Sequence, residues 1–272
     1  MYGDLARPPL RPAALRRALV RDGGLWRELR VLASTPSTNA VAAELARGGA
    51  AEGLVVVAES QTAGRGRLDR AWVSPPRAGL TLSVLLRPAV QAVEWGWLPL
   101  LTGLAVVTAL REHAGLAEAT LKWPNDVDVR GRKVAGILAE VPEPGAVVVG
   151  VGLNVTTTAA ELPADRPATS LALAGASTTD RDTVLRAVLR ALEHAYETWH
   201  VDPDRLRADY RSVCGTLGRA VRLELPGGEV VEGEATGVDA TGRLVLTGAG
   251  GSASYASGDV VHLRSSVVRD LR

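Results

Sequence analysis

Residues 121–155 read LKWPNDVDVRGRKVAGILAEVPEPGAVVVGVGLNV, and this stretch determines which class of fold to expect. Its apolar pattern predicts a strand that begins at Leu121–Trp123, a hairpin of the strands Asp126–Val129 and Val134–Val141, and a further strand Ala146–Val155. Strands joined by such short connections pair in antiparallel fashion. Elsewhere in the chain, strands are separated by helices. The sequence therefore predicts an α+β fold with a largely antiparallel or mixed sheet, and not a doubly wound parallel sheet.

The chain on either side of this stretch supplies the remaining elements of that fold. Before it, the sequence predicts a helix that Thr38 caps and that runs through Ala46, and apolar strands at Leu54–Glu59 and Gly79–Leu86. Residues 1–30 are expected to be a short N-terminal extension, whose prolines leave room for one brief helix. Further helices are expected at Leu98–His113, Thr183–Trp199 and Pro203–Val213.

From about Thr216 the sequence changes to short apolar strands separated by glycine turns. This spacing is typical of small all-β modules. We therefore expect a catalytic domain over residues 31–215 and a small SH3-like β-barrel domain over residues 216–272. The strands of that barrel are expected at Ala220–Leu225, Val230–Val238, Arg243–Leu246, Ser252–Tyr255 and Val260–Leu263.

The overall composition excludes several classes of protein. The chain carries 31 basic and 30 acidic residues, a net charge of +1, with the two signs interspersed. A general nucleic-acid-binding surface needs a basic excess, and a membrane protein needs a polybasic arm or a long apolar span, so neither partner is expected. The single cysteine, Cys214, excludes an internal disulfide, and the four histidines are too scattered for structural zinc. Because the N-terminus lacks an apolar signal-peptide core, a cytoplasmic protein is expected.

Lysine and asparagine are rare in this chain, and their positions point to a site. Of the 31 basic residues, only Lys122 and Lys133 are lysines, and the asparagines are Asn39, Asn125 and Asn154. An ammonium is a compact point charge, whereas a guanidinium is a wide planar fork. A position that keeps lysine in an arginine-rich chain is therefore a candidate for a catalytic or binding role that arginine cannot fill. The alternative is chance clustering, together with asparagines that form turns.

A polar, glycine-rich loop follows the strand Leu54–Glu59 and begins Gln61-Thr62-Ala63-Gly64-Arg65-Gly66-Arg67. Alternating glycines let backbone amides approach an anion, and the arginines add full positive charges. The loop lacks the lysine–serine pair of a P-loop, and no helix opens at Asp69 as a dinucleotide fingerprint would require. Taken alone, an exposed basic loop remains the alternative.

The segment Lys122-Trp123-Pro124-Asn125-Asp126 leaves a strand. Pro124 forces Trp123 into an extended backbone, which fixes the directions of Asn125 and Asp126. Asp126 is a candidate to hold Mg²⁺ or to orient an amine. Trp123 taken alone is expected to pack in the core.

Two glycine-containing strands complete the set of motifs. In GRKVAGIL, Lys133 begins a strand just after a tight turn, so its ammonium can project from the end of the sheet. Gly136, and Gly150 and Gly152 of GVGLN, weaken the strands that hold them, so a flat ligand lying against the sheet is a physical reason for their presence. The alternatives are a solvated hairpin lysine and strands that pack tightly where they cross.

The motifs, taken in order, resemble those of biotin–protein ligases. Ser37-Thr38-Asn39, the QTAGRGR loop with Trp72, KWPND, GRKVAGIL and GVGLN occur in the family's order over residues 31–265. The C-terminal part resembles the family's SH3-like domain. The resemblance implies a catalytic domain similar to class II aminoacyl-tRNA synthetases, with ATP and Mg²⁺ as cofactors. It also implies two steps: biotin is activated as biotinyl-5′-AMP, and is then transferred to a specific lysine of a biotin carboxyl carrier domain.

The same resemblance assigns roles to individual residues. Arg67, Lys133 and Asp126 would be catalytic, and Asp126 is also the candidate Mg²⁺ ligand. Trp72 resembles the aromatic cover of the loop. The ATP-binding residues would be Arg65, Arg67, Asn125, Lys133, Asn154 and Ala168. The biotin-binding residues would be Ser37, Thr38, Asn39, Gln61, Gly64, Arg65, Gly66, Arg67, Trp72, Lys133, Gly136, Gly150 and Gly152.

Two related functions remain as alternatives to biotin ligation. A lipoate or octanoyl ligase-transferase shares the core fold but has a glycine-rich signature with histidine, which this chain lacks. A biotin-responsive regulator would carry a helix-turn-helix domain, and residues 1–30 leave no room for one. Leu68-Asp69 stand where family members often have Arg-Gly, so the loop is expected to close differently.

Overall fold

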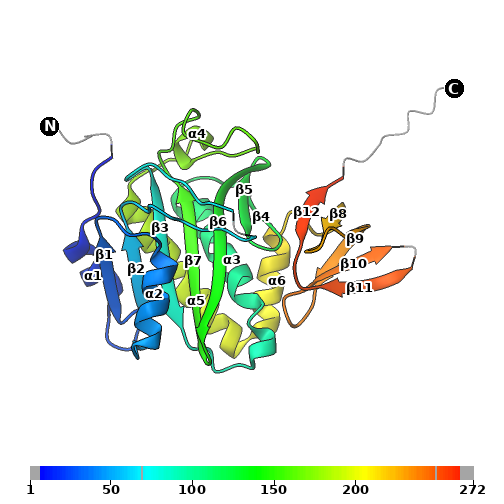
Figure 1. The fold of residues 1–272 in the computed structure, drawn as a ribbon, viewed down its shortest axis with the longest axis horizontal. Coiled ribbons are helices and arrows are strands. Elements are labelled where there is room, and N and C mark those ends of the chain that lie inside the picture. Colours follow the sequence, from blue (N-terminus) through cyan, green and yellow to red (C-terminus); the bar gives the residue numbers. More distant parts are fainter. Residues whose placement is uncertain (1–6, 69, 249, 264–272) are drawn as a thin grey trace.

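The computed structural model describes residues 7–68, 70–248 and 250–263, which form two sheets (Figure 1). The larger sheet has seven strands in the order β1-β2-β3-β7-β6-β5-β4. β1 and β2 pair in parallel, and every other neighbouring pair is antiparallel, so the predicted mixed sheet is confirmed. The strands are β1 (Glu28–Leu32), β2 (Leu54–Ala58), β3 (Gly79–Leu86), β4 (Ala119–Lys122), β5 (Asp126–Val129), β6 (Arg132–Glu143) and β7 (Ala146–Asn154).

Helices cover the two faces of this sheet unequally. α1 (Pro12–Leu19), α3 (Trp97–His113) and α5 (Arg181–Val201) lie on one face and build the main core with it. α2 (Thr38–Arg47) lies alone over part of the opposite face, where a smaller apolar cluster forms beneath it. Part of that second face is therefore left for a pocket.

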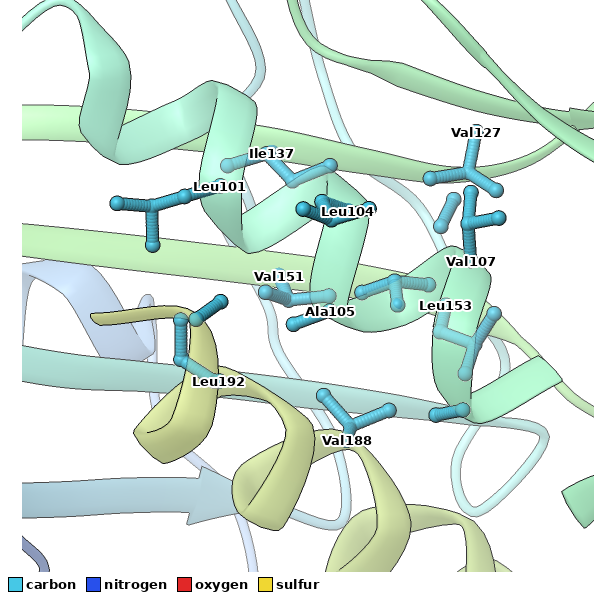
Figure 2. Packing of buried hydrophobic residues seen from close by; sticks show 14 of the residues in the cluster. Leu101, Leu104, Ala105, Val107, Val127, Ile137, Val151, Leu153, Val188 and Leu192 are labelled. Atoms are coloured by element: carbon cyan, nitrogen blue, oxygen red, sulfur yellow. The ribbon is translucent and has the colours of Figure 1, made fainter. Parts of the chain in front are cut away.

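The main core is a layer of branched side chains between α3 and the sheet. Figure 2 shows Leu104 of α3 beside Ile137 of β6, with Val151 of β7 and Val188 of α5 facing the same interior. These side chains are almost completely buried. Burying a branched aliphatic side chain contributes about 1.5–3 kcal/mol, so this layer holds the sheet rigidly behind the pocket.

The start of α2 differs from the sequence-based expectation. Ser37, and not Thr38, is the N-cap, and its side chain accepts a hydrogen bond from the Ala40 amide at 3.4 Å. A hydroxyl one residue earlier satisfies the same free amides of the first turn. The prediction of Thr38 as cap was wrong, and Thr38 is left free to make other contacts.

Other element ends follow the sequence closely. Residues 79–86, 126–129, 203–213 and 230–238 form the expected elements with the expected ends. The remaining shared elements differ by a few residues at their ends, where helices and strands fray.

None of the helices within the described residues is long and apolar enough to span a membrane. The elements not yet named are η1 (Ala92–Glu94), α4 (Leu171–Ala174) and α6 (Pro203–Val213).

The C-terminal strands form the second sheet, at the right in Figure 1. Its order is β11-β10-β9-β8-β12, all antiparallel. Among the described residues no ladder joins β11 to β12, so the expected small all-β domain is present as an open sheet. Its strands are β8 (Ala220–Glu224), β9 (Val230–Val238), β10 (Leu244–Gly248), β11 (Gly251–Tyr255) and β12 (Asp259–His262).

Two buried tryptophans join the second sheet to the first. The indole N–H of Trp97 donates to the Asp239 carbonyl at 3.1 Å, and that of Trp123 donates to the Gly242 carbonyl at 3.2 Å. Both rings are 1% exposed, which confirms the expected core position of Trp123. The junction brings β12 next to the end of β5, beside the open part of the large sheet (Figure 1).

Candidate active site

One pocket on the α2 side of the large sheet collects almost all of the predicted site residues. Its walls come from the start of α2, the loop after β2, strands β5 to β7, the segment before α4 and the start of β12. Segments that are distant in sequence thus meet in one cavity. The predicted residues that line it are Ser37, Thr38, Asn39, Gln61, Arg65, Gly66, Arg67, Trp72, Asn125, Asp126, Lys133, Gly136, Gly150, Gly152, Asn154 and Ala168.

Gly64 is the predicted site residue that does not line the pocket. A Cβ added there would lie 2.4 Å from the carbonyl oxygen of Trp72, whose amide donates to the Gly64 carbonyl at 2.9 Å. Gly64 is therefore needed for the loop to fold back on itself.

The floor of the pocket consists of glycine backbone. Gly136 of β6 pairs with Gly152 of β7, and Gly150 lies two residues further along the same strand. A Cβ on Gly152 would lie 2.3 Å from the Trp72 ring, and one on Gly150 would lie 2.2 Å from Asn39 Oδ1. A side chain at either position would push Trp72 or Asn39 aside, so these glycines are explained by what lies above them.

A buried polar network forms one end of the pocket. Gln61 Oε1 accepts from the Thr38 amide at 2.7 Å and lies 3.1 Å from the Thr38 hydroxyl. The Ser83 hydroxyl lies 2.7 Å from Thr38 Oγ1 and donates to Asn39 Oδ1 at 2.6 Å. These groups are held in fixed orientations, as required for recognising a neutral donor–acceptor pattern. Sequence reasoning missed Ser83, although a serine inside the fully buried strand β3 was a usable signal.

A carboxylate extends this network towards the loop. Glu140 of β6 accepts from Asn39 Nδ2 at 2.6 Å and forms an ion pair with Arg65 at 3.0 Å. Arg65 is therefore neutralised by a group outside the loop. Glu140 was also missed, because a glutamate near the end of a strand carries no local sign of a role.

The ammonium of Lys133 lies at the other end of the pocket. A register shift between β5 and β6 pairs Lys133 with Asp128, while Ala135 pairs with Val127. Such a bulge redirects a side chain from one face to the other. Nζ of Lys133 makes an ion pair with Asp126 and lies 6.0 Å from the centre of the Trp72 ring. Its backbone is fixed as well, because its amide donates to the Pro167 carbonyl at 3.1 Å.

Arg67 lines the same pocket from the loop. Its Nη1 donates to Asn125 Oδ1 at 3.2 Å, and Asn125 Nδ2 donates to the Ile137 carbonyl at 2.9 Å. Burial lowers the pKa of Arg67, and Asp259 and Asp126 oppose that shift. No carboxylate of the described residues lies within ion-pair distance of Arg67, so this guanidinium is available to an anion.

Asp128 is a further acid that the sequence reasoning left out. It lies two residues beyond Asp126, on the strand that pairs with Lys133. Burial raises the pKa of Asp128 to about 6; Asp126 also raises it, while Lys122 and Lys133 lower it. Both lysines of the chain therefore act on Asp128.

Trp72 covers the glycine floor. Its indole Nε1 is buried and has no hydrogen-bond partner within residues 7–68, 70–248 and 250–263. Leaving a buried N–H unpaired costs on the order of 1–3 kcal/mol. A water molecule or a ligand that enters the pocket can supply the missing acceptor.

The wall beside Lys133 comes from the segment before α4, which pairs with the Lys133 backbone. Asn154 Nδ2 donates to the Thr169 carbonyl at 3.0 Å, and the Thr169 amide donates to the Lys133 carbonyl at 2.8 Å. Ala168 lies between these contacts and lines the pocket, as does Arg166, which was not predicted. The segment is thus fixed to both β7 and β6.

Comparisons with known proteins agree with this architecture. Residues 31–155 match the biotin/lipoate A/B protein ligase family, and residues 216–263 match the biotin protein ligase C-terminal domain. The fold is therefore that of the biotin and lipoate ligases. The biotin–[acetyl-CoA-carboxylase] ligase of Mycobacterium tuberculosis is 47% identical over 96% of this chain and 98% of its own. This chain belongs to the biotin–protein ligase family.

Other relatives place the chain in the same family. The bifunctional ligase/repressor BirA of Bacillus subtilis is 36% identical over 85% of this chain and 71% of its own length. The structure of the biotin protein ligase of Aquifex aeolicus in complex with biotin and ATP has a TM-score of 0.75. It is 32% identical and covers 88% of this chain and 100% of its own. These findings favour biotin ligation over the lipoate alternative.

Proposed function

We propose that this protein activates biotin with ATP and transfers it to a lysine of a biotin carboxyl carrier domain. The observation that carries the proposal is that one pocket holds two cations from different segments, Arg67 and Lys133, beside a glycine floor. A pocket for a neutral ligand alone has no use for two fixed cations. Biotin has both a compact bicyclic ring with a planar ureido group and a carboxylate, which match the two halves of the pocket.

The ring system of biotin would lie over Gly136, Gly150 and Gly152, and the Trp72 ring, which contacts Gly152 in the ligand-free chain, would move aside to cover it. Its ureido group has both donors and acceptors, which suit the fixed hydroxyl and amide groups of Thr38 and Gln61. The unpaired indole N–H would gain an acceptor when the ligand enters. Asn39 would be held by Ser83 and Glu140 in one orientation at the end of the ring.

In the first step, an oxygen of the biotin carboxylate attacks the α-phosphorus of ATP, and pyrophosphate leaves. Two anions must approach each other, so fixed positive charges at the reacting oxygens lower the barrier. Lys133 and Arg67 would supply these charges, and Asp126 would orient the ammonium. Asn154 and Ala168 would border the adenine.

In the second step, a neutral lysine amine attacks the acyl carbon of biotinyl-5′-AMP, an amide bond forms and AMP leaves. The mixed anhydride hydrolyses easily, so covering it excludes water. Trp72 and the arginines of the loop would provide that cover. Asn125 and Asp126 would receive the incoming amine.

Mg²⁺ fits this site as a companion of ATP and not as a resident metal. Asp126 and Asn125 offer the oxygen donors that Mg²⁺ prefers. Among the described residues, however, no three acidic, histidine or cysteine side chains gather as a metal site, and Asp126 already pairs with Lys133. Mg²⁺ would be held by one carboxylate together with the phosphates of ATP.

We further propose that the chain acts as a cytoplasmic ligase without sequence-specific DNA binding. ATP is its co-substrate, which makes the cytoplasm the expected compartment. Between residue 7 and β1 the structure describes one helix, α1, whose Leu15 and Leu19 are buried in the main core. The net charge of +1 is well below the basic excess that duplex-binding domains carry. An electrophoretic shift with operator DNA would contradict this proposal.

Intact-mass spectrometry of a carboxylase carrier domain tests the main function. The carrier, biotin and MgATP are mixed with the protein, and the expected result is a carrier heavier by one biotinyl group. Replacing the carrier's target lysine with arginine should abolish the mass increase. Lipoic acid in place of biotin tests the related ligase, and preferential lipoylation would overturn the proposal.

A further inference from the structure

The loop of the catalytic domain makes an ion pair with the C-terminal sheet. The guanidinium of Arg70 pairs with the carboxylate of Asp259, the first residue of β12. Asp259 lines the pocket, although it comes from the second domain. No motif pointed to either residue, because their partnership exists only in the folded chain.

Asp259 is held in place by its own domain. It pairs with Glu224 of β8 in the second sheet. The preceding Gly258 has φ +157, and a Cβ there would lie 2.5 Å from Leu223 Cδ1. The backbone at the start of β12 is therefore packed tightly on β8, and it presents the carboxylate from a fixed position.

The charges of the loop explain why such a carboxylate is useful. Arg65, Arg67 and Arg70 repel one another. Glu140 neutralises Arg65, and Asp259 neutralises Arg70. Arg67 remains without an ion-pair partner among the described residues, so the loop presents one available cation to the pocket.

The backbone of the loop needs an external anchor at this point. The Gly66 amide donates to the Arg70 carbonyl at 2.7 Å, and the Arg70 amide donates to the Arg67 carbonyl at 3.2 Å. Within this turn Leu68 has φ +54, a left-handed conformation that is unfavourable for a side chain with a Cβ. A charge contact at Arg70 opposes relaxation of the turn.

We propose that Asp259 is a positioning residue of the ligase reaction: through Arg70 it fixes the segment that carries Arg67 and Trp72, so that the C-terminal sheet helps to retain the acyl-adenylate. This inference rests on the proposed function. Arg67 also lies 3.5 Å from the Gly258 carbonyl, so the start of β12 contacts the segment twice. The two domains therefore share one active site.

The test compares Asp259→Asn and Arg70→Gln with the parent protein. The enzyme is loaded with labelled biotin and MgATP, the free ligands are removed, and loss of bound adenylate is followed without carrier. The contact is partly exposed, so each variant should lose adenylate about fivefold faster. Combining both substitutions should add nothing further, and Arg70→Asp with Asp259→Arg should return the rate to within about twofold of the parent.

Glu118→Gln is the matched control, since Glu118 forms an exposed ion pair with Arg130. It should retain adenylate like the parent. A parent-like rate in either Asp259→Asn or Arg70→Gln would overturn the proposal. So would a charge-swapped protein as fast as the single variants, because that result would indicate a general disturbance of the second sheet.

A second measurement needs no ligand and separates this inference from the proposed function. Amide hydrogen exchange at Ala71 and Trp72 should be faster in both single variants than in the parent. If the parent forms no adenylate, the proposed function fails, while the exchange data still test the contact. Equal exchange in all proteins would overturn the positioning role.

Discussion

Nζ of Lys133 lies 2.5 Å from Oδ1 of Asp126, a residue on the neighbouring strand β5. The two side chains are 24% and 23% exposed, so the pair is partly withdrawn from water. A solvated hairpin lysine, the alternative interpretation of the sequence, would have neither this partner nor this burial. The bulge between β5 and β6 accounts for its position.

We expect Lys133→Arg to fold normally but to lose adenylation by about a hundredfold, because misplacing a catalytic charge by about 1 Å has an effect of this size. The wider guanidinium keeps the charge but cannot occupy the space of the ammonium between Asp126 and the substrate oxygens. Pyrophosphate release with biotin and ATP, without carrier, isolates this step. The neighbouring exposed Arg132→Lys is the control and should remain fully active. Parent-like release by Lys133→Arg would require another cation in the mechanism.

Gly152→Ala should weaken biotin binding much more than it weakens folding. The added methyl would lie 2.3 Å from the Trp72 ring and would displace the indole from the floor. Alanine is otherwise acceptable in a strand, so stability should change by about 1 kcal/mol or less. Calorimetric titration with biotin measures the effect. Gly237→Ala in β9, where no atom lies within 4 Å of the added Cβ, is the control, and equal affinity in both variants would contradict the assignment of the floor.

Trp72→Phe should separate ligand binding from stability. The buried indole N–H has no partner in the described structure, so removing it should leave the ligand-free protein as stable or more stable. If biotin supplies the acceptor, the variant should bind it about tenfold more weakly, the equivalent of one lost hydrogen bond. Trp95→Phe provides the opposite control. Its indole donates to the Val90 carbonyl at 3.3 Å outside the pocket, so stability should fall while biotin affinity stays unchanged.

The stability of the chain should fall in mild acid because of His262. Burial lowers the pKa of His262 to about 4, and the nearby Lys122 and Arg219 add to that shift. In the unfolded chain the imidazole has its ordinary pKa of about 6.5 and takes up a proton first. Between about pH 6.5 and pH 4 the unfolded state thus binds more protons, and the free energy of unfolding decreases as the pH falls.

Nε2 of His262 lies 3.4 Å from the Thr216 hydroxyl, so His262→Gln should remove this acid sensitivity while keeping a polar partner for Thr216. When the pH falls from 7.5 to 4.5, the free energy of unfolding should decrease less in the variant than in the parent, by on the order of 2 kcal/mol, as the pKa difference implies. Urea unfolding at both pH values measures the change. His113→Gln, on the exposed end of α3, should behave like the parent. An unchanged pH dependence in His262→Gln would show that other groups cause the loss of stability at low pH.

Local patterns in the sequence were enough to predict the mixed sheet and most of the pocket. Strand β3 alternates leucine and smaller residues, and its ends are marked by glycine and proline, so its limits follow from the pattern. The glycines of β6 and β7 were recognisable because they break otherwise branched strands. The family resemblance then brought together segments such as Ser37–Asn39 and Asn154 that periodicity alone does not connect.

The residues that were missed act through contacts between distant segments. Asp259 reaches the pocket only because the second sheet docks on Trp97 and Trp123. Glu140 and Arg166 are ordinary charged residues in their own stretches. The cap of α2 was misplaced by one residue for a different reason: Ser37 and Thr38 are both good caps, and the hydrogen bond between Thr38 and Gln61 decides between them.

The glycine floor also determines how this enzyme could acquire a new substrate. Gly136, Gly150 and Gly152 have no side chains to shorten, and each replacement can only take space from the pocket. A roomier site for an enlarged biotin analogue therefore has to be made at the rim, by trimming Trp72 or by moving the segment that Arg70 holds. Directed evolution that randomises the floor should return mostly inactive variants. Libraries at the rim leave intact the glycine surface that would contact the ring.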